Sequence, residues 1–335
     1  MPALEREGEI LDLLKSPRSI LLISVSGGKD SDVMLIRLWN WAREHGIDGE
    51  RIHVISAHLG RNEWSFALPH IQELTYDITG KAPIVVERPQ GDVLQQWEDR
   101  YATLQAQGRT HVAPFSDAKN RFCTSAAKRA QIHKKIIEMF PRDRLIVQAV
   151  GIRAEESPHR RKATTLKYLK KSPSAATLNR HVYTWLPIHS FSLQDVWQTL
   201  GWTLERLAEF QADVKQKVRA GDYEMLERVC EAWDYRWGRS YALGNTRLSC
   251  SLCPLANNND LLNGIAWNPD HFRDISALER RSGFSFKPKQ WLSDLGQSVL
   301  NLDEEQELVL AKEKNTLLRQ LATPRDPKPK QLNLL

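Results

Sequence analysis

Short apolar runs alternate with amphipathic stretches over the first 190 residues of the chain. Runs bounded by polar or glycine-containing segments predict β-strands, whereas apolar residues at helical spacing predict α-helices. The predicted strands are 20–25, 52–57, 83–87, 145–150 and 182–186. The predicted helices are 1–16, 30–45, 64–78, 92–106 and 124–139. Because strands that alternate with helices form parallel sheets covered on both faces, we expect an α/β fold with a doubly wound, five-stranded parallel sheet.

Helical periodicity dominates the chain after about residue 190. The predicted helices in this half are 193–200, 203–218, 223–235 and 304–321. The final segment is rich in proline and lysine, a composition typical of disordered chain. We therefore expect an α/β domain at 1–190, a helical subdomain at 191–322 and a disordered tail at 323–335.

Composition narrows the class of protein. The chain has 335 residues, of which 41% are hydrophobic, so it can bury a sizeable core. It contains no apolar run long enough for a transmembrane helix, and its charged N-terminal segment does not resemble a signal peptide. We expect a cytoplasmic protein with no membrane partner. A net charge of +6 is compatible with a nucleotide or nucleic-acid partner.

Ser26-Gly27-Gly28-Lys29-Asp30-Ser31 lies between the first predicted strand and the helix that follows it. Glycines let the backbone approach an anion closely, and the N–H groups and dipole of a helix N-terminus favour negative charge. Lys29 adds a positive charge. The spacing differs from GxxxxGK[ST] and from GxGxxG. An ordinary turn is the alternative, but the flanking strand and helix favour a phosphate-binding loop.

Three further polar segments are predicted to reach the same edge of the sheet, where ligands of open parallel sheets bind. They are 58–64, 119–125 and 151–162. The last concentrates cations and two carboxylates at a strand end, in Gly151-Ile152-Arg153-Ala154-Glu155-Glu156 and the basic residues that follow. Cations there can bind phosphates, and a carboxylate can hold Mg²⁺. A solvated charged loop is the alternative interpretation.

These segments together resemble a known family. The loop 26–31 resembles the PP-loop of the adenine-nucleotide α-hydrolase-like superfamily, which has a HUP-like fold. Arg121-Phe122-Cys123-Thr124 with Lys128, and the segment 151–157, resemble its phosphoadenosine phosphosulfate reductase branch. That branch includes the small subunit of ATP sulfurylase and the ATPase of DNA phosphorothioation systems, to which the layout is closest. The resemblance covers roughly residues 18–260.

The resemblance implies an ATP-dependent enzyme. PP-loop enzymes cleave ATP between the α and β phosphates, release pyrophosphate and transfer AMP to an acceptor oxygen, which prepares it for attack, often by sulfur. Ser26, Gly27, Gly28 and Ser31 would then cradle pyrophosphate. Lys29 would offset the developing charge.

The other site residues come from the same resemblance. Asp30 would contact Mg²⁺, and Arg153 and Lys128 would neutralise phosphate or sulfate groups. His58, Gly151 and Glu156 are expected to contribute to nucleotide binding, with His58 near the adenine and ribose.

Two departures from sulfonucleotide reductases favour ATP as the substrate. The chain has no cysteine after Cys253 and lacks the C-terminal Glu-Cys-Gly-Leu-His-like motif, and its PP-loop is intact. The expected role is activation of an acceptor for sulfur transfer or nucleic-acid modification, with DNA or tRNA and a cysteine desulfurase or other sulfur donor as partners. The alternatives are a sulfonucleotide reductase or sulfurylase-like enzyme, and a non-catalytic nucleotide- or nucleic-acid-binding module.

The cysteines are Cys123, Cys230, Cys250 and Cys253, as many thiols as a zinc ion or an iron–sulfur cluster needs. Two related enzymes, the adenylylsulfate reductases and the phosphorothioation ATPase, carry iron–sulfur clusters. The resemblance therefore implies a [4Fe–4S] cluster here. Zinc, a redox-active or sulfur-carrying Cys-x-x-Cys and inert cysteines stay open as alternatives. Cys230 lies in a helical pattern in which a buried structural thiol fits equally well.

Overall fold

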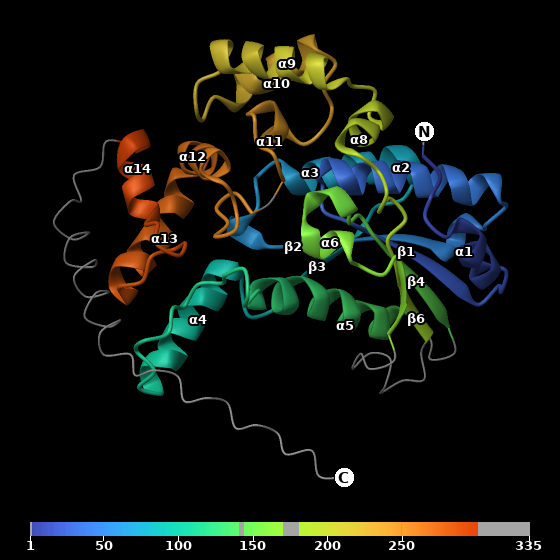
Figure 1. The fold of residues 1–335 in the computed structure, drawn as a ribbon, viewed down its shortest axis with the longest axis horizontal. Coiled ribbons are helices and arrows are strands. Elements are labelled where there is room, and N and C mark those ends of the chain that lie inside the picture. The colour runs from blue at the N-terminus through green and yellow to red at the C-terminus, as the bar shows by residue number, and fades with distance from the viewer. Residues whose placement is uncertain (1, 141–143, 170–180, 249, 301–335) are drawn as a thin grey trace.

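The fold is an α/β sheet with helices on both faces, seen in a computed structural model that describes residues 2–140, 144–169, 181–248 and 250–300 (Figure 1). The sheet has six strands in the order β3-β2-β1-β4-β6-β5. The strands are β1 (Ser19–Val25), β2 (Ile52–His58), β3 (Ile84–Glu87), β4 (Leu145–Val150), β5 (Leu166–Tyr168) and β6 (His181–Trp185). All neighbouring strands except the pair β5 and β6 run parallel, so the predicted doubly wound parallel sheet is confirmed.

The sheet has one strand more than the five that the sequence predicts. β5 pairs antiparallel with β6, and it occupies the edge of the sheet. It spans only Leu166–Tyr168, and none of these side chains is fully buried. So short a strand leaves no clear apolar run in the sequence, because its side chains are not needed to fill the core.

β1 lies at the centre of the sheet and is apolar on both faces. Leu21 and Ile23 join a core with α2 (Lys29–Glu44), α3 (Ala67–Thr79) and α1 (Glu7–Leu14). Ile20 and Leu22 point to the other face, where they meet α5 (Ala130–Met139). Figure 1 shows α1, α2 and α3 on one side of the sheet, with α4 (Val93–Ala106) and α5 on the other. The continuous apolar run of β1 is thus the pattern of a strand buried on both faces.

The predicted helix 124–139 begins irregularly. Thr124–Arg129 forms a π-helical turn, and regular α-helix starts only at Ala130. π-Turns are rare and often lie at functional sites. The other helical turns of this half are short, at Gly49–Arg51, Gly60–Asn62, Ala154–Glu156 and α6 (Pro158–Arg161).

The second half of the described chain is helical, as predicted. Its helices are α8 (Leu193–Thr199), α9 (Leu204–Lys217), α10 (Tyr223–Ala232), α11 (Arg239–Ala242), α12 (Asn258–Trp267), α13 (Pro269–Ser282) and α14 (Leu292–Leu300). The last four were not predicted. None of the helices in the described ranges is long and apolar enough to cross a membrane. The predicted helix 304–321 and the tail 323–335 lie outside the described residues.

One hydrophobic core joins the sheet to part of the helical half. Trp197 of α8, Phe210 of α9 and Leu226 of α10 belong to the same buried cluster as Leu21 of β1. A second cluster lies under α12, α13 and α14 and also takes in Trp97 of α4. The helical half is thereby brought against the carboxyl edge of the sheet. The boundary expected at residue 190 stays a prediction.

Candidate phosphate-binding site

The glycine loop between β1 and α2 has the conformation that the sequence predicts. Gly27 has a φ of +70°, in the left-handed region that favours glycine, and Gly28 caps the N-terminus of α2. Ser31 Oγ donates to the Gly28 carbonyl (2.8 Å) and accepts from the Ser26 N–H (3.1 Å). The Ser31 hydroxyl therefore joins Ser26 to Gly28 and fixes the loop at the start of α2, a helix of 16 residues.

Gly151, directly after β4, packs against the backbone at the start of α2. A Cβ atom at this position would lie 3.2 Å from the Asp30 carbonyl oxygen and 3.3 Å from the Ser31 nitrogen. A side chain would therefore push β4 away from the start of α2. This close approach of two backbones favours glycine at position 151, and its predicted role in nucleotide binding stays a prediction.

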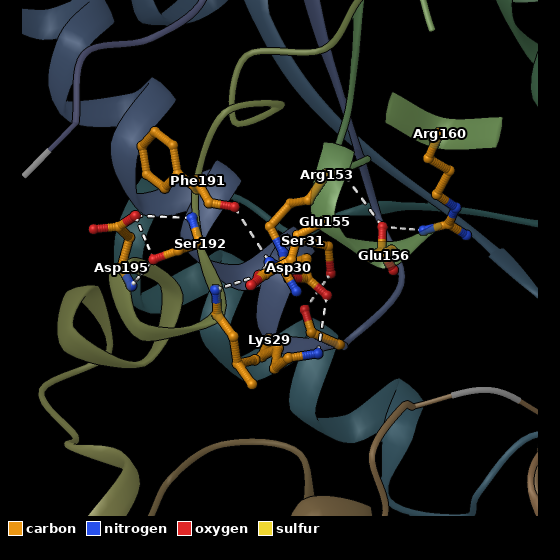
Figure 2. Close-up of polar contacts among 12 residues, drawn as sticks. Lys29, Asp30, Ser31, Arg153, Glu155, Glu156, Arg160, Phe191, Ser192 and Asp195 are labelled. Atoms are coloured by element: carbon orange, nitrogen blue, oxygen red, sulfur yellow. Dashed lines mark hydrogen bonds and ion pairs between the residues drawn. The ribbon is translucent and has the colours of Figure 1, made fainter. Parts of the chain in front are cut away.

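Asp30 stands between two buried cations (Figure 2). Its carboxylate accepts from Lys29 Nζ (3.1 Å) and from Arg153 Nε (2.5 Å). Burial lowers the pKa of the Lys29 ammonium, but the neighbouring Tyr241 and Asp30 outweigh burial, so the pKa lies above its usual value. Lys29 is 4% exposed and charged, a costly state that the Asp30 carboxylate stabilises.

Arg153 is held inside the protein and does not line the cavity beside the loop. Besides Asp30, its guanidinium donates to Glu155 (2.8 Å) and to the Phe191 carbonyl (3.2 Å). In this arrangement Arg153 positions Asp30, and its predicted contact with phosphate stays a prediction.

The cavity at the loop has a volume of about 140 Å³, smaller than pockets that enclose a whole drug-sized ligand. It suits a small anionic group. Lys29 and Arg160 bring positive charge to it, and Asp30 and Glu156 bring carboxylates. Glu156 also accepts from Arg160 and from the Arg153 N–H. The lining residues are Ser26, Gly28, Lys29, Asp30, Ser31, Gly151, Glu156, Arg160, Tyr241, Arg247 and Leu248.

Four lining residues were not among the site residues predicted from the sequence. Arg160 follows Glu156 by one helical turn, and Tyr241, Arg247 and Leu248 come from the helical half. The charge-rich segment 151–162 contained a signal for Arg160. No sequence pattern connects residue 241 to residue 29, since their contact depends on how the two halves dock.

His58 lies in a different and larger cavity, of about 680 Å³. Its Nδ1 is 2.7 Å from Glu63 Oε2, and this hydrogen bond raises the pKa of His58. His271 of α13 lines the same cavity and is 6% exposed. Neither of its ring nitrogens has a partner among the described residues, and burial lowers its pKa to about 4. The two predicted ligand-binding regions, at His58 and at the glycine loop, are therefore separate cavities.

The Cys-x-x-Cys pair is compact. The thiols of Cys250 and Cys253 share a hydrogen bond, which lowers the pKa of Cys253 to about 6 and raises that of Cys250. Cys123 and Lys128 are close enough to act electrostatically on Cys250. Lys128 therefore lies beside the thiols and is not among the residues that line the cavity at the glycine loop, and its predicted role toward phosphate or sulfate stays a prediction.

Cys230 lies apart from the other cysteines, which corrects the predicted ligand set. It is fully buried on the apolar face of α10 with Leu226 and Val229, and burial raises its pKa to about 12. No disulfide joins any of the four cysteines, all of which lie in the described ranges. In the described ranges, no three or more His, Cys, Asp or Glu side chains are grouped so that they could hold a metal ion. The predicted four-thiolate [4Fe–4S] site is therefore not supported.

The fold and the glycine loop together define a PP-loop protein. A comparison with protein families finds the phosphoadenosine phosphosulfate reductase domain over residues 20–205, more than half of the chain. The chain belongs to this family. A comparison with curated proteins found no match. Family membership makes the protein a nucleotide-using enzyme of the PP-loop class.

Proposed function

We propose that the protein cleaves ATP between the α and β phosphates, releases pyrophosphate and transfers AMP to an acceptor. The observation that carries the proposal is the intact loop with Lys29 buried beside it and Asp30 fixed between two cations. The N-terminus of α2 and Lys29 would stabilise the charge that develops on the leaving pyrophosphate. Catalysis would consist mainly of positioning and electrostatics.

Asp30 and Glu156 are suited to Mg²⁺ bound together with the substrate. Mg²⁺ is commonly held by one or two carboxylates plus substrate phosphates and water, and both carboxylates line the cavity. When bound, the ion would neutralise phosphate charge. Arg153 and Lys29 would keep the Asp30 carboxylate oriented toward the cavity.

The acceptor is proposed to be activated for sulfur transfer or nucleic-acid modification, with DNA or tRNA as the macromolecular substrate. The basic net charge supports a polyanionic partner. The unequal thiols of Cys250 and Cys253 are suited to receive sulfur from a donor such as a cysteine desulfurase, because the thiolate is the reactive form. The [4Fe–4S] cluster is not part of this proposal.

Pyrophosphate release tests the function. We expect the protein to release pyrophosphate from ATP when nucleic acid or sulfate is supplied, and Lys29→Ala to lower the rate by about 10²- to 10³-fold. Lys15→Ala is the control, because Lys15 is exposed and pairs with Asp12 at the surface. Equal rates for Lys29→Ala and the wild type would contradict the proposal.

A sulfonucleotide reductase is the second candidate, favoured by the family match itself. It would release sulfite from a sulfonucleotide with thioredoxin as the reductant. Sulfite release without pyrophosphate release from ATP would favour this candidate. A protein that binds nucleotide and gives neither product would be a binding module.

A further inference from the structure

Tyr241 of α11 lies directly against the glycine loop, although it belongs to the helical half of the chain. Its hydroxyl oxygen accepts from the backbone N–H of Lys29 (3.2 Å) and of Leu248 (3.1 Å). Its ring centroid is 5.1 Å from Lys29 Nζ, and the residue is 3% exposed. One phenol therefore joins the phosphate loop to the segment that precedes the Cys-x-x-Cys pair.

The fit at this contact leaves no room for additional atoms. A Cβ atom on Gly28 would lie 3.2 Å from the Tyr241 hydroxyl, and one on Gly238 would lie 3.1 Å from the Gly27 carbonyl oxygen. Glycine on both sides lets the turn before α11 press against the loop. The helical half thus supplies one wall of the cavity, with Tyr241, Arg247 and Leu248 in its lining.

The hydroxyl proton of Tyr241 is the one hydrogen-bonding group of this side chain that has no partner among the described residues. A tyrosine hydroxyl accepts with its oxygen lone pairs and donates one proton. Here the oxygen already accepts from two N–H groups, and among the described residues no acceptor takes the proton. Burial raises the pKa of Tyr241, so the phenol keeps its proton at neutral pH. The remaining acceptor for this proton is a ligand in the cavity that Tyr241 lines.

We infer that Tyr241 is a phosphate ligand of the PP-loop, donating its phenolic proton to an oxygen of the bound pyrophosphate group. The inference rests on the proposed function and adds to it a group from the helical half. The Lys29 N–H donates to the Tyr241 hydroxyl rather than to the phosphate. It still favours phosphate binding, because it polarises the hydroxyl that contacts the phosphate. The contact with the Leu248 N–H also holds the neighbouring Arg247 at the cavity.

Binding of inorganic pyrophosphate to the full-length chain tests this role. Tyr241→Phe keeps the ring and removes the hydroxyl, and we expect calorimetry to show about tenfold weaker binding. Tyr235→Phe is the matched control, because Tyr235 is 2% exposed and its hydroxyl donates to the Gly238 carbonyl (3.2 Å) without lining the cavity. We expect its affinity to stay within about twofold of the wild type.

A second measurement covers the case in which Tyr241→Phe does not fold. NMR spectra are recorded of protein that carries ¹³C at the Cζ atom of its tyrosines. Addition of pyrophosphate should shift one tyrosine resonance, and the same shift should be seen in Tyr235→Phe. Unchanged affinity in a folded Tyr241→Phe, or no such shift, would overturn the role of Tyr241 and leave the proposed function standing. Absence of pyrophosphate binding by the wild type would overturn the proposed function and, with it, this inference.

Discussion

The glycine loop and the cysteine region both combine distant parts of the chain, but they differ in how their side chains are connected. At the loop, ion pairs and hydrogen bonds link the charged side chains into one network. At the loop, Lys29, Asp30 and Arg153 are joined by short contacts, and Ser31 fixes the backbone. At the thiols, Cys250 and Cys253 bond to each other, while Cys230 lies in a separate core. Strand ends of a parallel sheet must converge on one edge, whereas cysteines on helices and loops have no such constraint.

The contrast predicts the largest effect at Arg153. Arg153→Ala would leave Asp30 beside the cavity without its closest cation, and breaking a buried ion pair from one side costs about 3–5 kcal/mol. Urea unfolding followed by tryptophan fluorescence would measure the loss. Arg273→Ala is the control, because Arg273 forms an exposed pair with Asp270 and should change the midpoint little. A similarly small loss for both variants would show that the network at the loop contributes little.

The glycine loop and the cysteine region also differ in how well the sequence predicts them. The five parallel strands, the glycine loop and the charged segment after β4 were predictable, because apolar runs, a glycine turn and a cluster of charges mark them locally. The pairing of Arg153 with Asp30 was not, since it depends on whether Arg153 points into the core or into the cavity. Tyr241 was not assigned because its contact with Lys29 depends on how the two halves of the chain dock. Cys230 was grouped with the other thiols by count alone.

A second prediction probes His271, on the helix beside the thiol-containing core. Its pKa of about 4 in the folded protein lies below the ordinary value of 6.5, so the unfolded chain binds the proton more tightly between these values. Stability should therefore fall as the pH drops from about 6.5 toward 4. In His271→Leu, the loss of unfolding free energy between pH 7 and pH 4 should shrink by about 3 kcal/mol.

Chemical denaturation of both proteins at the two pH values measures this difference. His45→Leu is the control for replacing a histidine at an exposed position, since His45 is an exposed residue at the end of α2. Parallel pH profiles for the wild type and His271→Leu would show that water reaches the ring, and that the region beside the thiols is more open than the loop.

The smallest effect is expected in the cysteines. At pH 7, iodoacetamide should modify Cys253 at least about a hundredfold faster than Cys230, because the thiolate reacts and the pKa values are about 6 and about 12. The rate at Cys253 should fall as the pH drops below about 6. Mass spectrometry of tryptic peptides would measure both rates, and Cys253→Ser would confirm the assignment. Equal rates of modification at Cys253 and Cys230 would contradict the difference between the pKa values of these two thiols.

The product formed from ATP tests the central proposal most directly. Protein incubated with ATP labelled at the α or the γ phosphate, together with tRNA, DNA or sulfate, should yield pyrophosphate from the γ label and AMP or an adenylated acceptor from the α label. Lys29→Ala should lower the rate of formation of both products by about 10²- to 10³-fold. Formation of ADP and orthophosphate by the wild type would contradict cleavage between the α and β phosphates, as would the absence of pyrophosphate with every acceptor.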